Sequence, residues 1–260
     1  MKVESNHTLI AGGSRGIGAA LAKYLAKAGH LVSVLSRKSP QSEYPTSSIR
    51  HWELDVRNPS QIPEVISSIS EARGEINNLI ISLRYRGEGE DWTGEMETGP
   101  QAARNLIEHL IKYKKRNALK SIVVVSSVAS MFVADEQSIN YHMARAALDQ
   151  LVRYFAVLLG PKGIRVNSVL PSIMQKEESK SFYLQQPKLT KMFQDITPLG
   201  RMGNTDDIGG AVRFLCSQEA SFLTGQEIIV DGGLSLRGQE TVARQVSGFT
   251  HPNLNSKSNN

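Results

Sequence analysis

The fold is decided by a glycine-rich stretch near the amino terminus, Ala11-Gly12-Gly13-Ser14-Arg15-Gly16-Ile17-Gly18. It follows the apolar run Thr8-Leu9-Ile10 and opens a segment whose apolar residues recur at helical spacing, Ile17, Leu21, Leu25 and Ala28. This order predicts a strand, a glycine turn and a helix. Glycine allows the backbone angles of such a turn and lets a pyrophosphate approach the free amides at the helix N-terminus. The spacing is G-x-x-x-G-x-G, so the stretch alone predicts either a phosphate cradle or an ordinary tight turn.

The composition indicates one globular domain. The chain has 260 residues, 40% of them hydrophobic, which suits a single α/β core. No apolar run approaches the roughly 18 to 20 residues of a membrane span, and the polar residues 1–7 do not form a signal segment. The single cysteine, Cys216, excludes an internal disulfide framework, and the six histidines show no metal-ligand spacing. We therefore expect a cytoplasmic protein that uses no metal and contacts no membrane.

Two polar segments have a simple interpretation. The basic run Lys112 to Arg116 is interpreted as a solvated helix end rather than a patch for an acidic partner. It is too short and too poor in aromatic residues to predict nucleic-acid binding. The last ten residues, His251 to Asn260, have a low-complexity composition and are expected to be disordered.

Strand-like and helix-like segments alternate along the rest of the chain. The strand-like runs are Leu31 to Leu35, His51 to Val56, Leu79 to Ile81 and Ile122 to Ser127. One helix is expected to begin at the cap Asn58, and another spans about 101 to 112, while residues 84–99 are expected to form a glycine-rich, acidic loop. The alternation predicts an α/β fold with a doubly wound parallel sheet, Rossmann-like, in a single domain.

The end of the second strand predicts the cofactor. At this point of a Rossmann-type unit, a carboxylate binds the ribose 2′-OH of NAD, whereas a basic group accommodates the 2′-phosphate of NADP. Here Ser36 stands where the acid is expected, followed by Arg37 and Lys38, and Arg15 lies in the glycine loop. The residues therefore favour NADP over NAD. Asp55, at the end of the third strand, either meets an adenine or finishes a turn.

A tyrosine and an arginine four residues apart are the candidate catalytic pair. Tyr141 and Arg145 share one face at the start of a long predicted helix. A neighbouring cation favours the phenolate, which brings a tyrosine closer to use as a general acid. Ser127, at the end of the fifth strand, is placed to hold a substrate carbonyl while Tyr141 protonates its oxygen. The alternative is a capping tyrosine and a surface arginine.

Motifs late in the chain carry a family resemblance. They are Arg165-Val166-Asn167-Ser168-Val169-Leu170-Pro171, Pro198-Leu199-Gly200-Arg201-Met202-Gly203, Ala220-Ser221-Phe222-Leu223-Thr224-Gly225-Gln226 and Val230-Asp231-Gly232-Gly233. With the glycine loop, Ser127 and Tyr141, they resemble the short-chain dehydrogenase/reductase family over about residues 7 to 236. Within that family the chain is most similar to the 3-oxoacyl-carrier-protein reductases.

The resemblance implies an organisation and a site. The implied organisation is a Rossmann-like domain over 1–236, a substrate lid over about 173–197, a C-terminal extension over 237–260, and a homodimer or homotetramer. The implied catalytic residues are Ser127, Tyr141 and Arg145. The implied cofactor contacts are Gly12, Ser14, Arg15, Gly16, Ile17, Gly18, Ser36, Arg37, Lys38, Asp55, Val56, Tyr141, Arg145, Pro171 and Ile173.

Departures from the family pattern gather around the expected site. The family's Tyr-x-x-x-Lys becomes Tyr141-x-x-x-Arg145, and arginine keeps the charge but is wider and effectively never releases its proton. The family's Asn-Asn-Ala-Gly reads Ile81-Ser82-Leu83-Arg84, and the threonine that braces it is replaced by Ala11. Two bulky side chains therefore stand where the family keeps small ones.

Two further departures lie in the second half of the site. Met96 aligns with the asparagine of the family's catalytic relay. The run Pro171-Ser172-Ile173-Met174-Gln175-Lys176 replaces the usual Pro-Gly and its following threonine, and Lys176 is expected to face solvent. Beyond residue 237, four residues with helical character are expected to form a short helix over the site or toward a neighbouring subunit, Glu240, Val242, Ala243 and Val246.

Two functions follow from these residues. The first is an NADP-dependent carbonyl reductase or alcohol dehydrogenase that acts on a 3-oxoacyl thioester, a polyketide or a sugar, with the acyl group free or bound to a carrier. The second is an impaired family member that binds a nucleotide or a partner subunit with little turnover, which the changed relay residues favour. The retained Ser127 and Tyr141 favour the enzyme.

Overall fold

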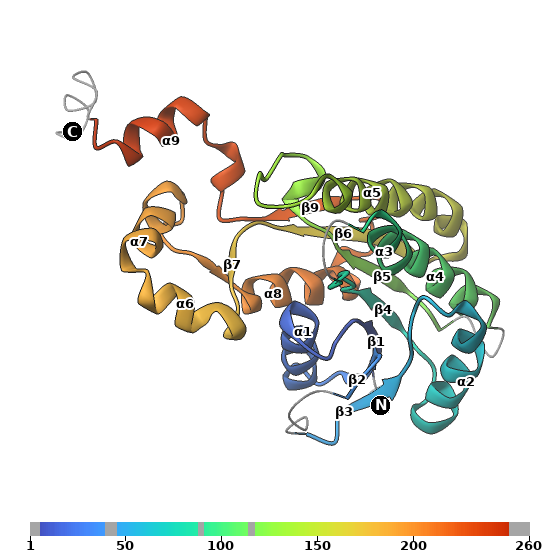
Figure 1. Ribbon diagram of the computed structural model, residues 1–260. Coiled ribbons are helices and arrows are strands. Elements are labelled where there is room, and N and C mark those ends of the chain that lie inside the picture. Colours follow the sequence, from blue (N-terminus) through green and yellow to red (C-terminus); the bar gives the residue numbers. More distant parts are fainter. Residues whose placement is uncertain (1–5, 40–45, 88–90, 114–117, 250–260) are drawn as a thin grey trace.

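A seven-stranded parallel sheet organises the computed structural model, which describes residues 6–39, 46–87, 91–113 and 118–249. The spatial order of the strands is β3-β2-β1-β4-β5-β6-β9 (Figure 1). Their bounds are β1 (His7–Ala11), β2 (Leu31–Ser36), β3 (Ile49–Glu53), β4 (Asn78–Ile81), β5 (Ser121–Val125), β6 (Arg165–Pro171) and β9 (Glu227–Val230). The predicted doubly wound parallel sheet is confirmed. The expected disordered tail and most of the basic run, residues 114–116, lie outside the described residues.

Helices cover both faces of this sheet. Their bounds are α1 (Gly16–Lys27), α2 (Ile62–Arg73), α3 (Trp92–Met96), α4 (Ala102–Lys112), α5 (Ile139–Leu159), α6 (Lys180–Gln185), α7 (Pro187–Ile196), α8 (Thr205–Cys216) and α9 (Gln239–Val246). One core packs α2, α4 and α5 on the sheet, and a second core packs α1 and α8 on the opposite face. Of the helices in the described ranges, none combines the length and the apolar composition needed to cross a bilayer.

Strand β1 shows why the sequence forms a sheet buried on both faces. Leu9 and Ala11 point into the core with α2, α4 and α5, while Ile10 points into the core with α1 and α8. Alternate residues of a strand face opposite sides, so a continuous apolar run is needed when helices cover both sides. The same alternation holds in β5, where Val124 and Val123 divide between the two cores.

The structure differs from the expected element bounds in three places. β3 lies at Ile49–Glu53, earlier than the expected 51–56, because its parallel register pairs Ile49 with Val32. β5 ends at Val125 because Ser127 already caps the next turn, a 3-10 helix labelled η3 (Val128–Ser130). α5 begins at Ile139, before Tyr141, because the hydroxyl of Ser138 accepts the amide of Tyr141 and caps the helix.

The expected loop at 84–99 is partly helical, which corrects the sequence-based expectation. Asp91 caps α3 by accepting the amide of Gly94 at 2.9 Å, and the Tyr85 hydroxyl donates to the same carboxylate at 2.6 Å. A π-helical turn, Glu97–Gln101, joins α3 to α4 and contains Pro100. Proline cannot donate a backbone hydrogen bond, so a wider turn accommodates it. The glycine content concealed this capped helix.

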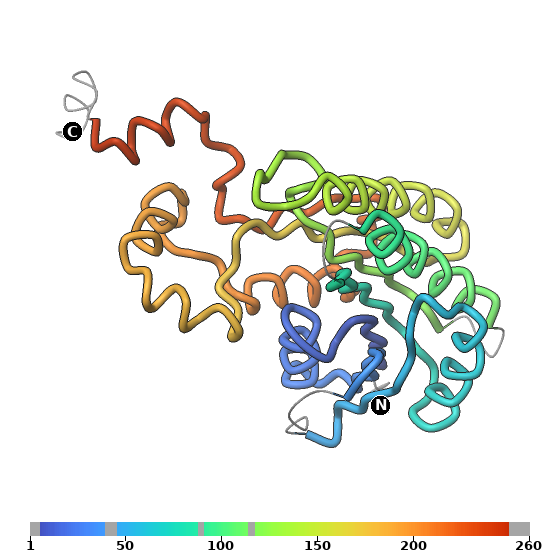
Figure 2. The backbone as a smooth tube through the Cα atoms, viewed as in Figure 1, coloured from blue at the N-terminus to red at the C-terminus, as the bar shows by residue number. Residues whose placement is uncertain are grey.

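The strand order reverses between β1 and β4, and this reversal places the site. In an open parallel sheet, ligands bind beyond the carboxyl ends of the strands at such a reversal. At the same edge, the chain leaves the sheet after β6, runs through α6 and α7, and returns through α8 (Figure 2). A short parallel pair, β7 (Met174–Gln175) and β8 (Gly203–Asn204), joins the departing and returning chains.

Candidate active site

Two glycines bring β1, β4 and α1 into close contact. Gly12 has a φ of +89°, and a Cβ on it would lie 2.4 Å from the carbonyl oxygen of Ser82, just after β4. A Cβ on Gly18, in the first turn of α1, would lie 2.2 Å from the carbonyl oxygen of Gly12. Real Cβ atoms do not approach oxygen so closely, so these positions require glycine. The cradle at the carboxyl edge of the sheet is therefore built by backbone.

The N-terminus of α1 already holds an anion from another part of the chain. The amide of Gly16 donates to Oε1 of Glu178 at 2.8 Å, although 162 residues separate them. Glu178 lies in a 3-10 turn, η5 (Glu177–Ser179), within the segment expected to form the lid. Arg86 also approaches, with Nη2 3.4 Å from the place of a Cβ on Gly16. The carboxylate stands in for an anionic ligand group, so the residues present fit a phosphate.

The remaining residues of the glycine loop line this turn. Arg15 is exposed and precedes the first residue of α1, and its side chain does not cap the helix. Ser14 and Ile17 are partly exposed at the same turn. The structure therefore places the predicted loop residues together at one edge of the sheet.

The end of β2 presents cations and no carboxylate. The Ser36 hydroxyl donates to the carbonyl of Lys38 at 2.9 Å and lies 2.8 Å from Nε2 of His51. Burial lowers the pKa of His51. Arg37 and Lys38 are exposed. No acidic side chain takes the position of Ser36 itself, and Glu53 of β3 is its register partner on the neighbouring strand.

Asp55 is engaged with its own neighbour. Its carboxylate accepts from Nε and Nη2 of Arg57 at 3.2 and 2.8 Å and from the Arg57 amide at 3.1 Å. The hydrogen bonds from the Arg57 side chain lower the pKa of Asp55. This geometry is the turn-finishing alternative from the sequence, and an adenine contact stays a prediction. Val56 is buried beside it.

Ser127 and Tyr141 come from adjacent elements. Ser127 begins η3, where its hydroxyl accepts the Ala129 amide at 3.2 Å, and η3 packs against α5. Tyr141 lies in the first turn of α5 and is partly exposed. Within the described residues, the Tyr141 hydroxyl has no hydrogen-bond partner. It is therefore free to donate to a ligand at the edge where Ser127 lies.

Two guanidinium groups flank the Tyr141 ring. Cζ of Arg145 lies 4.7 Å from the ring centroid, and Cζ of Arg84 lies 5.2 Å from it. Arg145 is only 3% exposed, and both Nη atoms donate to the carbonyl of Leu83 at 3.2 Å. Arg145 therefore ties α5 to the chain that follows β4. Its expected contact with a ribose stays a prediction.

Glu95 is a buried acid that the sequence analysis missed. Its side chain is 9% exposed, Oε2 has no hydrogen-bond partner, and burial raises its pKa against the opposing charges of Arg145 and Arg84. Met96, which aligned with the relay asparagine, is the next residue and is partly buried. Glu95 stands in an acidic segment that looked solvated, so no pattern in the sequence marked it as buried.

Lys176 does not face open solvent, which corrects the expectation for it. The residue is half-buried, and burial lowers the pKa of its ammonium, as do Arg84 and Arg86. It follows two residues expected to contact the cofactor, Pro171, which is buried at the end of β6, and Ile173, which is partly buried. The chain that leaves β6 therefore brings a cation toward the site.

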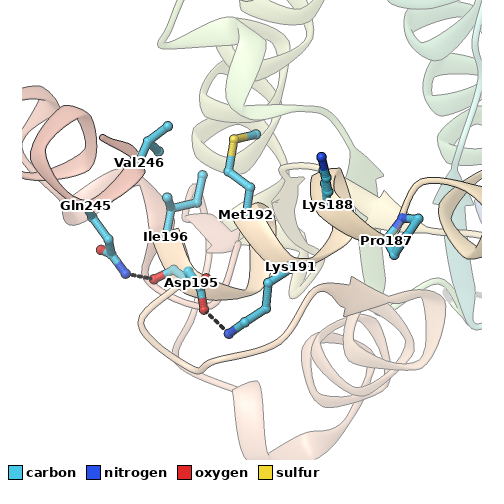
Figure 3. A pocket seen from close by; sticks show the side chains of 8 residues that line it. All are labelled: Pro187, Lys188, Lys191, Met192, Asp195, Ile196, Gln245 and Val246. Carbon is cyan, nitrogen blue, oxygen red and sulfur yellow. Dashed lines mark hydrogen bonds and ion pairs between the residues drawn. The ribbon is translucent and has the colours of Figure 1, made fainter. Parts of the chain in front are cut away.

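A separate cavity of about 500 Å³ lies between α7 and α9 (Figure 3). It is lined by Pro187, Lys188, Lys191, Met192, Asp195, Ile196, Gln245 and Val246. None of the predicted catalytic or cofactor residues lines it. Nε2 of Gln245 donates to the carbonyl of Asp195 at 2.5 Å, so the expected C-terminal helix forms and contacts α7.

Comparisons with known proteins agree with the fold and identify the family. Residues 11–235 match the family model described as enoyl-(acyl carrier protein) reductase. A tropinone reductase homologue of Arabidopsis thaliana is 32% identical, covering 91% of this chain and 92% of its own. A 3-oxoacyl-[acyl-carrier-protein] reductase of Vibrio cholerae is 29% identical, covering 90% and 99%. Among solved structures, a short-chain dehydrogenase of Leptospira borgpetersenii with bound NAD+ is 25% identical with a TM-score of 0.75, covering 89% and 93%.

Proposed function

Because the chain belongs to the short-chain dehydrogenase/reductase family, we propose that it is an NADP(H)-dependent oxidoreductase that reduces a carbonyl or oxidises the corresponding alcohol. Residues 11–235 carry the family match, and the site residues lie within that range. The fold is shared by many activities, so the proposal rests on the groups at the site.

The cofactor assignment rests on the residues that follow two neighbouring strands, β1 and β2, at the carboxyl edge of the sheet. The Gly12 and Gly18 cradle and the Gly16 amide would hold the pyrophosphate, since that amide already donates a hydrogen bond to a carboxylate. Arg37 and Lys38 would meet a 2′-phosphate, and the absence of an acid at Ser36 favours NADP. When bound, this cofactor supplies or accepts a hydride.

The chain's own residues handle the proton and the carbonyl. The Tyr141 hydroxyl donates its proton to the carbonyl oxygen, and in the reverse direction the phenolate takes it back. The Ser127 hydroxyl donates a hydrogen bond to the same oxygen and orients it. The guanidinium groups of Arg145 and Arg84 lie beside the Tyr141 ring, with Cζ 4.7 and 5.2 Å from the ring centroid. This placement of Tyr141, with a hydroxyl that has no partner among the described residues and two cations beside its ring, carries the proposal.

The substrate classes proposed on resemblance are a 3-oxoacyl thioester, a polyketide and a sugar, either free or bound to a carrier. The relative from Vibrio cholerae supports the first class by its printed name. We also propose a homodimer or homotetramer, which is the usual assembly of the family, and a substrate lid formed by residues 173–197.

A binding protein without turnover is the second candidate. The observation that favours it is the engagement of Arg145, whose two Nη atoms both donate to Leu83 and whose Nε is buried without a partner. A residue held in this way does not relay protons. On this alternative, the protein binds the nucleotide and changes no ketone.

The test joins binding to turnover. Purified protein is titrated with NADPH and with NADH by fluorescence, and is then assayed on 3-oxoacyl thioesters, polyketide-like diketones and keto sugars. We expect tighter binding of NADPH, turnover of one class, and a loss of about 10²- to 10⁴-fold in kcat for Tyr141→Phe at unchanged NADPH affinity. Binding without turnover on every class selects the second candidate. Absence of binding for both nucleotides overturns both.

A further inference from the structure

Positive charge gathers beside Tyr141, beyond what the family's site contains. Arg84 takes the position of the last glycine in the family's Asn-Asn-Ala-Gly, and Arg86 follows two residues later. Both side chains are exposed at the carboxyl edge of the sheet. The cofactor cradle requires neither of them, and Arg145 already places a cation beside Tyr141, so the second guanidinium there calls for its own explanation.

Arg84 is held over the reaction centre. Its Cζ lies 5.2 Å from the Tyr141 ring centroid, and its Nη2 donates to Oε1 of Gln137 at 3.0 Å. Gln137 belongs to the segment that leads into α5, so the guanidinium is positioned from two sides. The remaining guanidinium N–H groups have no partner among the described residues and are available to a ligand.

Two more cations approach the same space from different segments. Arg86 reaches the glycine loop, where its Nη2 comes within 3.4 Å of the place of a Cβ on Gly16. Lys176 comes from the chain after β6 and is half-buried, and its charge interacts with Arg84, Arg86, Tyr141 and Glu178. Residues 82–87 and 174–178 therefore bring three cations to one region of the site, which extends from Tyr141 to the Gly16 turn.

Within the described residues, these charges are balanced only in part. No ion pair to Arg84, Arg86 or Lys176 occurs there. One carboxylate close to Arg86 and Lys176, that of Glu178, already accepts the Gly16 amide, and Glu95 is buried next to Arg145 and Arg84. Like charges held together and partly removed from water are unfavourable unless an anion joins them. A guanidinium in particular matches the two oxygens of a carboxylate or phosphate.

We propose that the substrate is an anion whose carboxylate or phosphate is bound by Arg84 and Lys176 next to the carbonyl at Tyr141. This inference rests on the proposed function and narrows its substrate class. Arg86, which lies nearer the glycine loop, serves the cofactor side of the same region. The cofactor's own phosphates do not explain Arg84, because that side chain covers the ring of the proton donor.

The test compares charged and neutral ligands that share one carbonyl. The full chain is titrated calorimetrically, in the presence of NADP, with levulinate, with its methyl ester and with dihydroxyacetone phosphate. We expect one of the two anions to bind at least tenfold more tightly than the neutral ester. The preferred anion identifies a carboxylate or a phosphate, and its affinity should fall as salt is raised.

Variants then locate the site. Arg84→Gln and Lys176→Gln should each weaken binding of the preferred anion about tenfold and leave binding of the ester unchanged. Arg104→Gln, an equal charge change on the exposed face of α4, should leave both unchanged. Equal binding of anions and ester by the unmodified protein, or anion binding insensitive to Arg84→Gln and Lys176→Gln, overturns the inference.

The two proposals fail in different ways. If the protein binds anions through Arg84 but reduces no ketone of the panel with NADPH, the anion site stands and the proposed reductase activity is overturned. If the protein reduces neutral and anionic ketones equally well, the reductase activity stands and the preference for an anionic substrate is overturned. In Lys176→Gln, a raised KM for the oxo acid with an unchanged kcat/KM for the ester separates recognition of the anion from an effect on Tyr141.

Discussion

The carboxyl ends of β1 and β4 are neighbours in the sheet but are built in different ways. The β1 edge, residues 11–18, is made by backbone: Gly12 and Gly18 fit because a Cβ would meet a carbonyl oxygen, and the Gly16 amide is the binding group. The β4 edge, residues 82–87, is made by side chains, with Leu83 buried and Arg84 and Arg86 reaching outward. A site made by backbone tolerates little change, whereas a site made by side chains can be rebuilt for another ligand.

The largest effect should come from a substitution in the β1 edge, residues 11–18. Gly18→Ala would place a Cβ 2.2 Å from the carbonyl oxygen of Gly12, so the turn must move away from α1. We expect NADPH affinity to fall by about 100-fold or more, since a displacement near 1 Å at such a site costs about this factor. Fluorescence titration measures it. Gly210→Ala on α8 is the control, because its Cβ meets only the Tyr24 hydroxyl, at 3.8 Å. Unchanged NADPH affinity in Gly18→Ala would contradict the comparison.

The next effect tests whether the β4 edge also has a structural part. Arg145→Met removes the donors to the Leu83 carbonyl and leaves Glu95 without a nearby buried cation. We expect the free energy of unfolding to fall by about 2–4 kcal/mol, because a buried carbonyl and a buried acid lose their partner. Urea denaturation measures this difference. Arg104→Met, at an exposed ion pair with Glu108, should leave stability unchanged. Equal free energies of unfolding for Arg145→Met and the unmodified protein would show that the hydrogen bonds from Arg145 to the Leu83 carbonyl do not stabilise the fold.

A smaller effect joins the two edges through the lid segment. Glu178→Gln weakens the contact with the Gly16 amide and removes a negative charge from the place where a pyrophosphate would lie. We expect NADPH to bind about threefold to tenfold more tightly, as an exposed charged hydrogen bond is of modest strength. Inorganic pyrophosphate should show the same change in calorimetry. Glu177→Gln, the adjacent exposed acid, is the control. A variant that binds NADPH less tightly than the original would refute competition by Glu178.

An effect of intermediate size lies behind both edges, at Asp149 of α5. The side chain is 2% exposed, and neither carboxylate oxygen has a hydrogen bond, because Ser126 and Ser130 donate to backbone carbonyls. Burial raises the pKa of Asp149, and the nearby Ser130 and Ser126 hydroxyls oppose the rise, as Arg153 does more weakly. A carboxyl with a raised folded pKa stabilises the fold at low pH and loses that contribution as pH rises through the folded value.

Asp149→Asn should therefore be about 1–3 kcal/mol more stable than the original at pH 8 and show a smaller difference near pH 4. Urea denaturation at pH 4.5, 6 and 8 follows the change. A stability difference that stays constant or shrinks as pH rises would contradict the sign given by the buried acid. The result shows whether the buried Asp149 carboxylate, behind the side-chain part of the site, lowers the stability of the folded protein.

The sequence predicted the backbone part of the molecule well. The alternation of apolar runs and the glycine loop gave the parallel sheet, since both follow from local rules of burial and turn geometry. The bounds of β3 and α5 shifted by a few residues because pairing with β2 and the Ser138 cap decide them. The helix α3 was missed because its cap, Asp91, lies in a glycine-rich segment.

The side-chain part was predicted less well, for a physical reason. The sequence drew attention to Tyr141 by its match to a family pattern and to Arg145 and Arg84 by their departure from it, but it could not show which way each guanidinium points. The engagement of Arg145 with Leu83 and the burial of Glu95 depend on packing between α3, α5 and the chain after β4. Such long-range contacts leave no periodic signal. The residues of the candidate site therefore remain a prediction for experiment.

The contact between Glu178 and the Gly16 amide changes what a measured cofactor affinity means. The free protein is already satisfied at this amide by one of its own carboxylates, so cofactor binding is an exchange of one anion for another. The observed constant then reports the difference between two bound states and understates the strength of the cradle itself. Phosphate or sulfate buffers add a third competitor, so titrations in different buffers will disagree until the exchange is written into the binding equation.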